Sequence, residues 1–433
     1  MMQSESSDPA IQSLRDEAVR LRRAVEELSI LNDLARTIGA SLDSQQIMDT
    51  IVRRSVRAVN AEQGVITLVD HQRRDPQKTF VRVMDTSAEH ERLRPTEHLL
   101  GWMHLNKKPI QINTPRDDER FRGVRWDESV RSVLCVPMMI KSELTGVLTV
   151  YNKKGASGFT EDDQRLLAIL AAQSAQVIEN ARLIERERQL LKIQEELRLA
   201  SKIQMDLLPK TSPEIPGYRL AGKTIPAQVI GGDYFDFLRI DDHRWAFCLG
   251  DVSGKGLPAS LLMASTQATV RGQAINGLTP VECVARSSRL LYETTDPEKF
   301  VTLFFGILDV REHRLCYANA GHEHPYLIDP TGNVQRLGAG GIALGMLEDF
   351  PFEEDCVPFG VGSTLVVCSD GITEAMDATA AQFGDERLGM LVRERRQAGA
   401  EGLIEEIVRA VRWHAGETPQ ADDMTLIVIQ RES

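Results

Sequence analysis

The sequence predicts an α+β protein built from several domains, and three observations support this. Its 433 residues exceed the length of a typical single domain, which indicates two or three domains. Strand-like apolar runs and amphipathic helices occur together in both halves of the chain. Helices with a heptad pattern precede the first block of strands and separate it from the second.

Composition argues against several classes of function. The formal net charge of −12 argues against a nucleic-acid-binding surface and against binding to an anionic membrane, because both favour a basic face. No run approaches the roughly 18 apolar residues of a membrane span, and the first residues lack an apolar signal segment, which predicts a cytoplasmic protein. The six cysteines form no CxxC pair and are predicted to be reduced core residues: Cys135, Cys248, Cys283, Cys316, Cys356 and Cys368.

Residues 1–27 are predicted to form an N-terminal coiled-coil helix. Its two interleaved heptad positions carry Ile11, Ala18, Val25 and Asn32, and Leu14, Leu21, Leu28 and Ala35. Branched residues and one Asn at the first position, with Leu at the second, favour a parallel two-stranded coil and therefore a homodimer. An amphipathic helix packed on its own domain is the alternative.

Residues 28–182 are predicted to form a small α+β sensor domain with an antiparallel sheet. A helix over 44–59 is followed by strand-like runs, and a long helix closes the domain. The strand-like runs cover 64–70, 78–85, 132–140 and 143–153. Thr160 is expected to cap the closing helix, which has acidic residues in its first turn.

The closing helix is expected to continue as a coiled-coil linker over 183–209. One heptad position carries Leu183, Leu190, Leu197 and Gln204, and the other carries Ile193, Ala200 and Leu207. Pro209 ends the helix. The remaining residues, 210–433, are enough for one catalytic domain.

The C-terminal half holds four acidic clusters, each beside an apolar, strand-like run. They contain Asp233 and Asp236, Asp251, Asp370, and Asp422 with Asp423. A single acidic residue beside a strand is usually only part of a turn. Four such clusters at strand ends can converge on one place, where their carboxylates would raise one another's pKa unless a cation compensates.

Ligand sets made only of oxygen atoms select hard ions, so the clusters predict a site for Mn²⁺ or Mg²⁺. Two such ions can bridge a water molecule, lower its pKa and align the resulting hydroxide for in-line attack on phosphorus. The sequence offers no Ser-His-Asp order and no reactive-cysteine loop of the C-x5-R type. The pattern therefore favours hydrolysis by metal-activated hydroxide.

A set of motifs makes this half resemble the metal-dependent protein phosphatase (PPM) family. In order along the chain they are GGDYFD, GDVSGKGLPASL, FVTLFFGILD, YANAGHEHPYLI, SDGITEA and DDMTLIVI. The resemblance covers about 210–433 and is greatest to the bacterial branch typified by the sporulation stage-II phosphatase and the stress-response sigma-regulator phosphatases. It implies a PPM-type α-β-β-α sandwich with two Mn²⁺ or Mg²⁺ ions in a cleft at one end.

The resemblance also implies roles for the acidic residues. Asp251 would bridge both ions, and the Val252 carbonyl would replace the glycine carbonyl that usually follows it. The implied metal ligands are Asp233, Asp251, Val252, Asp370, Asp422 and Asp423, and the implied catalytic residues are Asp233, Asp251, Asp370 and Asp422. Asp236 is expected to support the metal ligands without binding the ions itself. Asp423 could have the same supporting role instead of binding an ion. No arginine stands out as a phosphate clamp, so the metals would hold the phosphate.

Two further patterns in this half are interpreted as having no catalytic role. His322 and His324 share a strand face, but the family usually carries one His there, so His322 is expected to be structural near the cleft and His324 incidental. The GDVSGKG segment resembles a phosphate loop, but its spacing is one residue short and Gly256, not Ser or Thr, follows Lys255.

The N-terminal half resembles a GAF domain over roughly 28–182, through the stretch TGVLTVYNKKGASGFTEDDQRLLAILAAQSAQVIENARL. Asn152, Lys153, Phe159 and residues 161–163 are similar to the NK-F-DE element of cyclic-nucleotide-binding GAF domains, and we expect them to stabilise the fold instead. The residues expected in the core, or alternatively around a pocket, are Trp102, His104 and Cys135. The signal for this domain, a small molecule or a protein, is not identified by the sequence.

The combined resemblance implies a signal-regulated phosphatase that acts on phosphoserine or phosphothreonine in a protein. The implied substrate is a phosphorylated anti-sigma-factor antagonist of the STAS type, and linker residues 203–208 would couple the GAF domain to metal binding. Two alternatives stay open: a catalytically silent sensor or scaffold with a decayed phosphatase fold, and an enzyme that acts on a small phosphorylated molecule. All four catalytic aspartates are present, which argues against decay.

Overall fold

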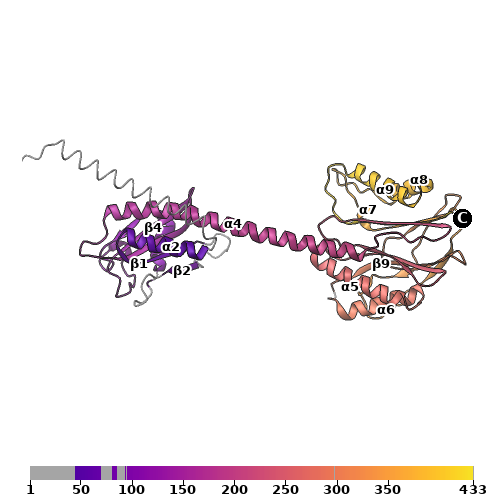
Figure 1. Cartoon of the computed structure of the whole chain (residues 1–433), viewed down its shortest axis with the longest axis horizontal. Coiled ribbons are helices and arrows are strands. Elements are labelled where there is room, and N and C mark those ends of the chain that lie inside the picture. The colour runs from indigo at the N-terminus through magenta and orange to yellow at the C-terminus, as the bar shows by residue number, and fades with distance from the viewer. Residues whose placement is uncertain (1–43, 70–79, 85–92, 94, 297, 433) are drawn as a thin grey trace, which may run out of the picture. The chain divides into compact units, whose positions relative to one another are not determined.

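The computed structural model describes residues 44–69, 80–84, 93, 95–296 and 298–432 (Figure 1). The chain divides into two compact units, 1–191 and 192–433. The predicted N-terminal coiled-coil helix over 1–27 lies outside the described residues, as do its heptads up to Ala35. In the described part of the chain, no helix combines the length and the apolar character needed to cross a bilayer.

The first unit is an antiparallel sheet with helices on both faces. Its elements are α2 (Ser44–Ala58), β1 (Ala61–Leu68), β2 (Phe80–Met84), α3 (Glu97–Asn106), β3 (Ile110–Ile112), the 3₁₀ turn Glu119–Phe121, β4 (Val133–Ile140), β5 (Glu143–Lys153) and the first part of α4 (Glu161–Leu207). The strand order is β2-β1-β5-β4-β3, and every neighbouring pair is antiparallel. The predicted antiparallel sheet is confirmed.

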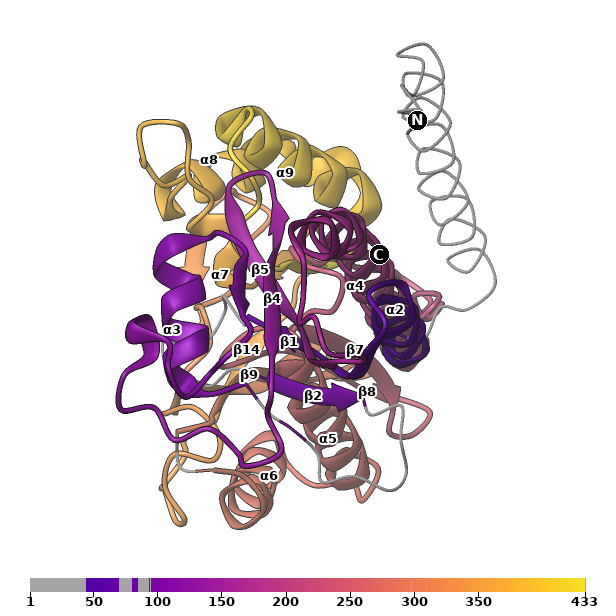
Figure 2. The same cartoon turned by 90° about the vertical axis from the view of Figure 1, so that its left-hand side faces the viewer.

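Alternation along the strands gives this sheet two apolar faces. On β5, Leu148 and Val150 belong to the cluster with α2 and α4, whereas Val147 and Tyr151 belong to the cluster with α3. Figure 2 shows the sheet between α3 on one side and α2 and α4 on the other. The helix that closes the domain is therefore part of its core.

Hydrogen bonds around the start of α4 support the expected structural role of the NK-F-DE element. Thr160 caps the helix as predicted: Asp163 N–H donates to Thr160 Oγ1 at 3.2 Å, and Thr160 N–H donates to Asp163 Oδ2 at 2.9 Å. Lys153 Nζ donates to both oxygens of Asp163, at 2.8 and 2.9 Å. The Asn152 side chain accepts from Arg131 N–H at 2.8 Å. These groups join β5 to the helix and to the preceding loop.

Two of the three residues expected in the core lie there. Cys135 is buried and Trp102 is partly buried in the cluster beside α3. The expectation for His104 is wrong, because this side chain is exposed. On α3 the buried positions are Leu99 and Met103, one helical turn apart, and His104 is rotated by about 100° from that stripe.

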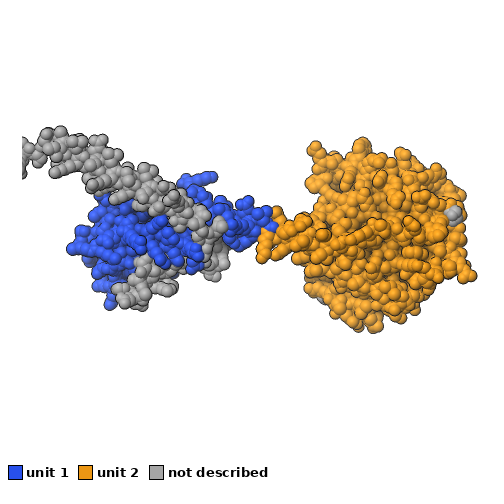
Figure 3. Space-filling view, viewed as in Figure 1, with its two compact units in different colours: residues 1–191 blue, residues 192–433 orange. Residues whose placement is uncertain are grey.

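The second unit, orange in Figure 3, is an α-β-β-α sandwich. Its elements are β6 (Tyr218–Ile225), β7 (Tyr234–Arg239), β8 (Arg244–Val252), α5 (Leu257–Ala274), α6 (Pro280–Thr294), β9 (Val301–Asp309), β10 (Arg314–Ala320), β11 (Tyr326–Ile328), β12 (Val334–Arg336), β13 (Gly340–Gly341), β14 (Asp355–Pro358), β15 (Thr364–Cys368), α7 (Asp370–Thr373), α8 (Asp385–Arg395), the 3₁₀ turn Arg396–Ala398, α9 (Ala400–Ala415) and β16 (Met424–Arg431). One sheet has the order β13-β10-β9-β8-β7, with β14 also paired to β10, and the other has the order β12-β11-β15-β16-β6.

Three apolar clusters hold the four layers together. Phe304 and Ile427 lie in the cluster between the two sheets. Their chain neighbours point outward: Phe305 packs in the cluster with α5 and α6, and Val428 packs in the cluster with α8 and α9. The strands are thus buried on both faces, and the sandwich implied by the resemblance is confirmed.

The predicted closing helix and linker form one helix, α4, of 47 residues. It ends at Leu207, two residues before Pro209, and Leu208 is buried in the cluster with α5. The boundaries 28–182, 183–209 and 210–433 stay predictions, as does pairing of the helix in a coiled coil.

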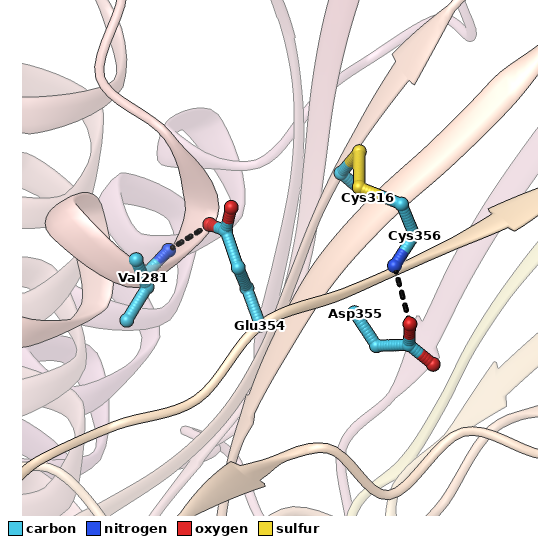
Figure 4. Close-up of a disulfide and its surroundings, with 5 residues drawn as sticks. All are labelled: Val281, Cys316, Glu354, Asp355 and Cys356. Atoms are coloured by element: carbon cyan, nitrogen blue, oxygen red, sulfur yellow. Dashed lines mark hydrogen bonds between the residues drawn. A yellow bond between two sulfur atoms is a disulfide. The ribbon is translucent and has the colours of Figure 1, made fainter.

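The prediction that all six cysteines are reduced is wrong at two positions. Cys316 of β10 and Cys356 of β14 are directly opposite in the antiparallel register and form a disulfide (Figure 4). Beside it, Glu354 accepts a hydrogen bond at 3.1 Å from Val281 N–H in the first turn of α6. This segment therefore ties β14 both to the sheet and to a helix. The cysteines that are buried and free, as predicted, are Cys135, Cys248, Cys283 and Cys368.

Loss of the disulfide is expected to lower the free energy of unfolding of the second unit. The cross-link joins residues 40 positions apart, and the chain-entropy model gives up to about 4 kcal/mol for a loop of that length. Denaturant unfolding of wild type and of the double variant Cys316→Ser/Cys356→Ser, without reductant, measures the difference. The difference should vanish when both proteins are reduced, and equal stability without reductant would contradict the prediction.

Candidate metal centre

The second unit brings the predicted aspartates to one end of its two sheets. Asp233 directly precedes β7, and Asp251 is the penultimate residue of its neighbour β8. In the other sheet, Asp370 opens α7 two residues after β15, and Asp422 lies two residues before the adjacent β16. Asp251, Asp422 and Asp423 line one cavity. This arrangement agrees with the expectation that the four acidic clusters at strand ends lie close together.

Burial and mutual repulsion raise the pKa of three of these carboxyl groups. Burial raises the pKa of Asp251 to about 7, and the charges of Asp370 and Asp422 add to the effect. Burial, followed by the charge of Asp422, raises the pKa of Asp370 to about 6. Asp233 is only 4% exposed, and burial and Asp251 raise its pKa. The carboxylates therefore destabilise one another's charged forms, a penalty that a divalent cation would offset.

The residues present fit a divalent cation of the hard type. Oδ2 of Asp233 is buried and has no hydrogen-bond partner among the described residues. A Cβ on Gly232 would stand 3.0 Å from the Val252 carbonyl oxygen and 3.7 Å from Asp251 Oδ1, so the glycine keeps the space beside both oxygens open. Carboxylate and carbonyl oxygens are the ligands that Mg²⁺ and Mn²⁺ prefer. Within the described ranges, no three Asp, Glu, His or Cys side chains already surround one point closely enough to hold an ion.

Asp423 has both carboxylate oxygens occupied by backbone N–H groups. Oδ1 accepts from Ala227 at 2.8 Å, and Oδ2 accepts from Gly232 at 2.7 Å and from Asp233 at 3.3 Å. A Cβ on Gly231 would overlap this carboxylate. The sequence assigned Asp423 to the metal ligands, with a supporting place as the alternative. The geometry favours the supporting place, because Asp423 fixes the loop that carries Asp233.

Asp236 lies on β7, three residues after Asp233, and its expected role in support of the metal ligands stays a prediction. Its side chain is buried on β7 and accepts from Arg271 Nε at 2.9 Å and from Arg271 Nη2 at 3.1 Å. The pair joins β7 to α5, the helix that follows the Asp251 loop.

Lys255 is a residue of this site whose role the sequence analysis missed. Its Nζ lies 2.9 Å from Asp422 Oδ2 and donates to the carbonyl oxygen of Ala421 at 2.6 Å. Among the described residues that line the cavity, Lys255 is the only cationic one. The signal that could have found it is a lysine between Gly254 and Gly256, shortly after the strand that contains Asp251.

The two histidines do not form a metal pair. His322 is buried, its Nδ1 lies 2.9 Å from Thr302 Oγ1, and burial lowers its pKa to about 4. Thr302 is the cross-strand partner of Asp251, so His322 packs beneath the site. His324 is exposed. This placement agrees with a structural His322 and an incidental His324.

Comparisons with protein-family models match both halves of the chain. Residues 41–179 match the GAF domain model, and residues 241–432 match the model of Stage II sporulation protein E (SpoIIE). The second match includes Asp251, Asp370 and Asp422, whereas Asp233 precedes it.

Individual proteins resemble a little over half of the chain. Protein IcfG of Synechocystis sp. is 28% identical over 263 residues, which cover 54% of this chain and 41% of that protein. Phosphoserine phosphatase RsbU of Bacillus subtilis is 26% identical over 241 residues, which cover 55% of this chain and 71% of that protein. The SiaA-PP2C domain of Pseudomonas aeruginosa has a TM-score of 0.49 and 23% identity, and the match covers 56% of this chain and 98% of that domain. The chain thus matches about two fifths of the first relative's length and seven tenths of the second's.

Removal of the charge at Asp251 is expected to stabilise the metal-free protein at neutral pH. The folded carboxyl keeps its proton up to about pH 7, whereas the unfolded one loses it near pH 3.8. The stability linked to that proton is present at low pH and is lost as the pH rises from about 4 to 7. Asp251→Asn should therefore gain up to about 4 kcal/mol at pH 8 and little near pH 4.

Thermal or denaturant unfolding in EDTA at the two pH values measures this gain. Asp242→Asn is the matched control, because the Asp242 side chain is 82% exposed. An equal free energy of unfolding for wild type and Asp251→Asn at pH 8 would contradict the prediction that the ionised Asp251 carboxylate destabilises the metal-free fold.

Proposed function

We propose that this chain, which joins a GAF domain to a SpoIIE-type phosphatase domain, hydrolyses phosphoserine or phosphothreonine in a protein with the help of two divalent metal ions. The observation that carries the proposal is the gathering of aspartates with raised pKa at one end of the sandwich. A relative from Bacillus subtilis is named a phosphoserine phosphatase, which supports the same class of substrate.

The chain offers five oxygen-bearing groups for two Mn²⁺ or Mg²⁺ ions. The residues proposed to hold them are Asp233, Asp251, Asp370, Asp422 and, through its carbonyl, Val252. When bound, such ions supply Lewis acidity that lowers the pKa of water and offsets the charge of a phosphoryl group. The mutual repulsion of the carboxylates favours this binding, because each ion removes a penalty that the folded chain otherwise carries.

Other side chains position these ligands. Asp423 holds the loop before Asp233 through three backbone N–H groups. Asp236 and Arg271 hold β7 against α5. Asp370 and Asp422 are partly exposed, whereas Asp233 is buried, so a phosphorylated side chain on a protein surface would approach from the side of the first two.

The proposed substrate is a phosphorylated anti-sigma-factor antagonist of the STAS type, and the proposed place of action is the cytoplasm. The support is the resemblance of the motifs to the stress-response branch of the family and the similarity to the phosphoserine phosphatase RsbU.

The end of α4 supports a route by which the GAF domain regulates the metal centre. Gln204, in the last turn of the helix, is buried. Its Nε2 donates to the Gly231 carbonyl oxygen at 2.6 Å, and its Oε1 accepts from Gly231 N–H at 3.1 Å. The next N–H, that of Gly232, donates to Asp423. In the proposed route, a rotation of α4 moves the loop that carries Asp233 and so changes metal binding.

The middle of α4 has the surface of a coiled-coil strand. Leu183, Leu190 and Ile193 occupy the predicted heptad positions, and more than half of each side chain is exposed. Exposed apolar residues at this spacing fit a second helix of the same kind. The proposed partner is the same helix of a second copy, which makes the protein a homodimer.

Release of phosphate from a phosphoserine peptide is expected to require Mn²⁺ or Mg²⁺. Asp251→Asn and Asp370→Asn should each lower the rate at least roughly 100-fold, because loss of a direct ligand exceeds the effect of losing an outer partner. Asp242→Asn should retain the wild-type rate. Hydrolysis of p-nitrophenyl phosphate alone would favour a small-molecule substrate, and a folded, metal-binding chain inactive on both substrates would favour the scaffold.

Loss of the Gln204 side-chain amide is expected to weaken Mn²⁺ binding. Gln204→Leu keeps the size and helix propensity but removes both hydrogen bonds to Gly231, which corresponds to roughly a tenfold change in affinity. Titration of the full chain by Mn²⁺ electron paramagnetic resonance measures it, with the exposed Gln194→Leu on the same helix as the control. Unchanged affinity in Gln204→Leu would exclude this route.

A further inference from the structure

We propose that Lys255 recognises the phosphoryl group of the substrate: its ammonium group pairs with Asp422 when no metal is bound there, and donates to a phosphoryl oxygen when a divalent ion takes Asp422. This inference rests on the proposed phosphatase function and adds the phosphate-binding cation that the sequence analysis did not find. It stands on the position of the loop, on the nature of the contact and on the charge of the cavity.

The loop over 253–256 places Lys255 in the wall of the cavity. It connects the end of β8, with Asp251 and Val252, to α5. Gly254 and Gly256 have φ of +97° and +74°, conformations that side-chain-bearing residues rarely adopt. The lysine is thus held between two positions that only glycine occupies easily, within the lining that contains Asp251 and Asp422.

The contact of Lys255 with Asp422 is of a kind that a metal ion can replace. The side chains are 50% and 42% exposed, and pairs this open to water contribute little stability. A divalent ion brings twice the charge to the same carboxylate. The displaced ammonium keeps three donors on a flexible four-carbon chain, which suits a tetrahedral group with several acceptor oxygens.

The negative charge of the cavity explains why a lysine there would favour binding of a phosphoryl group. A phosphate monoester carries close to two negative charges at neutral pH and must approach several carboxylates. Lys255 is the only cationic residue among the described ones that line the cavity. The nearest rival is Lys299, whose Nζ lies 3.1 Å from the point where a Cβ on Gly254 would stand. It is held beside the loop because Phe300 N–H donates to Ser253 Oγ at 3.0 Å.

The test compares the Mn²⁺-loaded wild-type chain with Lys255→Met, Lys255→Arg and Lys299→Met. Exposed Lys223→Met on β6 is the control. In Lys255→Met, the KM for a phosphoserine peptide and the inhibition constant of inorganic phosphate should rise by the same factor, roughly 10- to 100-fold for a lost hydrogen bond to a charged group. Lys255→Arg should restore part of the loss. Mn²⁺ affinity, measured by electron paramagnetic resonance, should be equal to or tighter than in wild type, because the competing ammonium is gone.

An unchanged inhibition constant in Lys255→Met, or an equal or larger loss in Lys299→Met, would overturn the assignment. So would weaker Mn²⁺ binding large enough to account for the whole effect. Binding of inorganic phosphate, followed by phosphorus NMR on the Mn²⁺-loaded chain, separates this inference from the proposed function. Wild type that binds phosphate but releases none from a peptide refutes the function, while the phosphate affinity of Lys255→Met still decides the inference. Wild type that does not bind phosphate refutes the inference.

Discussion

The second unit depends on one constraint: several carboxyl groups, buried or partly buried, lie close together where two sheets end. Asp233, Asp251 and Asp370 have their pKa raised by burial before any neighbour acts. Such a site opposes folding, and it persists because the layers beneath it are apolar on both faces of every central strand. Phe304 and Leu365, between the sheets, are fully buried. The sandwich thus holds carboxyl groups where burial and mutual repulsion disfavour their ionised forms. A divalent cation bound there would offset this electrostatic cost.

Close backbone approach at this end of the sheets explains why its loops contain glycine. A Cβ at Gly231 would overlap the Asp423 carboxylate, and one at Gly371 would overlap the Asp423 carbonyl oxygen. Asp423 therefore sits in a pocket made of main chain, and its oxygens satisfy N–H groups that would otherwise be buried without partners. Asp422, Asp423, Gly231 and Gly232 all line the cavity, and the Gly232 N–H donates to Asp423. A change on either side reaches the aspartate at the start of β7.

The parts of the fold that the sequence predicted are those encoded by local pattern. An apolar, strand-like run predicted β5 with the bounds later observed, Glu143–Lys153, and Thr160 marked the start of α4. The disulfide could not be predicted, because Cys316 and Cys356 meet only through the register of β10 and β14. The contact of Lys255 with Asp422 likewise joins distant segments, and the role of Asp423 depends on backbone donors that leave no mark in the sequence. The gathering of the aspartates was predictable because each one is tied to a strand end, whereas the metal ligation itself stays a proposal.

The uneven burial of α4 decides where a signal could act. Its first turns are buried with the first unit, through residues such as Leu167 and Ala171, and its last turn is fixed by Gln204. Between them the side chains are largely exposed, and the described stabilising contacts are surface ion pairs such as Arg198 with Glu195, which contribute little. A helix held at both ends and weakly held between them responds most to whatever packs against its middle. In the proposed dimer that partner is a second α4, so a change in how the two helices pair would be felt first at Gln204 and, one hydrogen bond further, at Gly231.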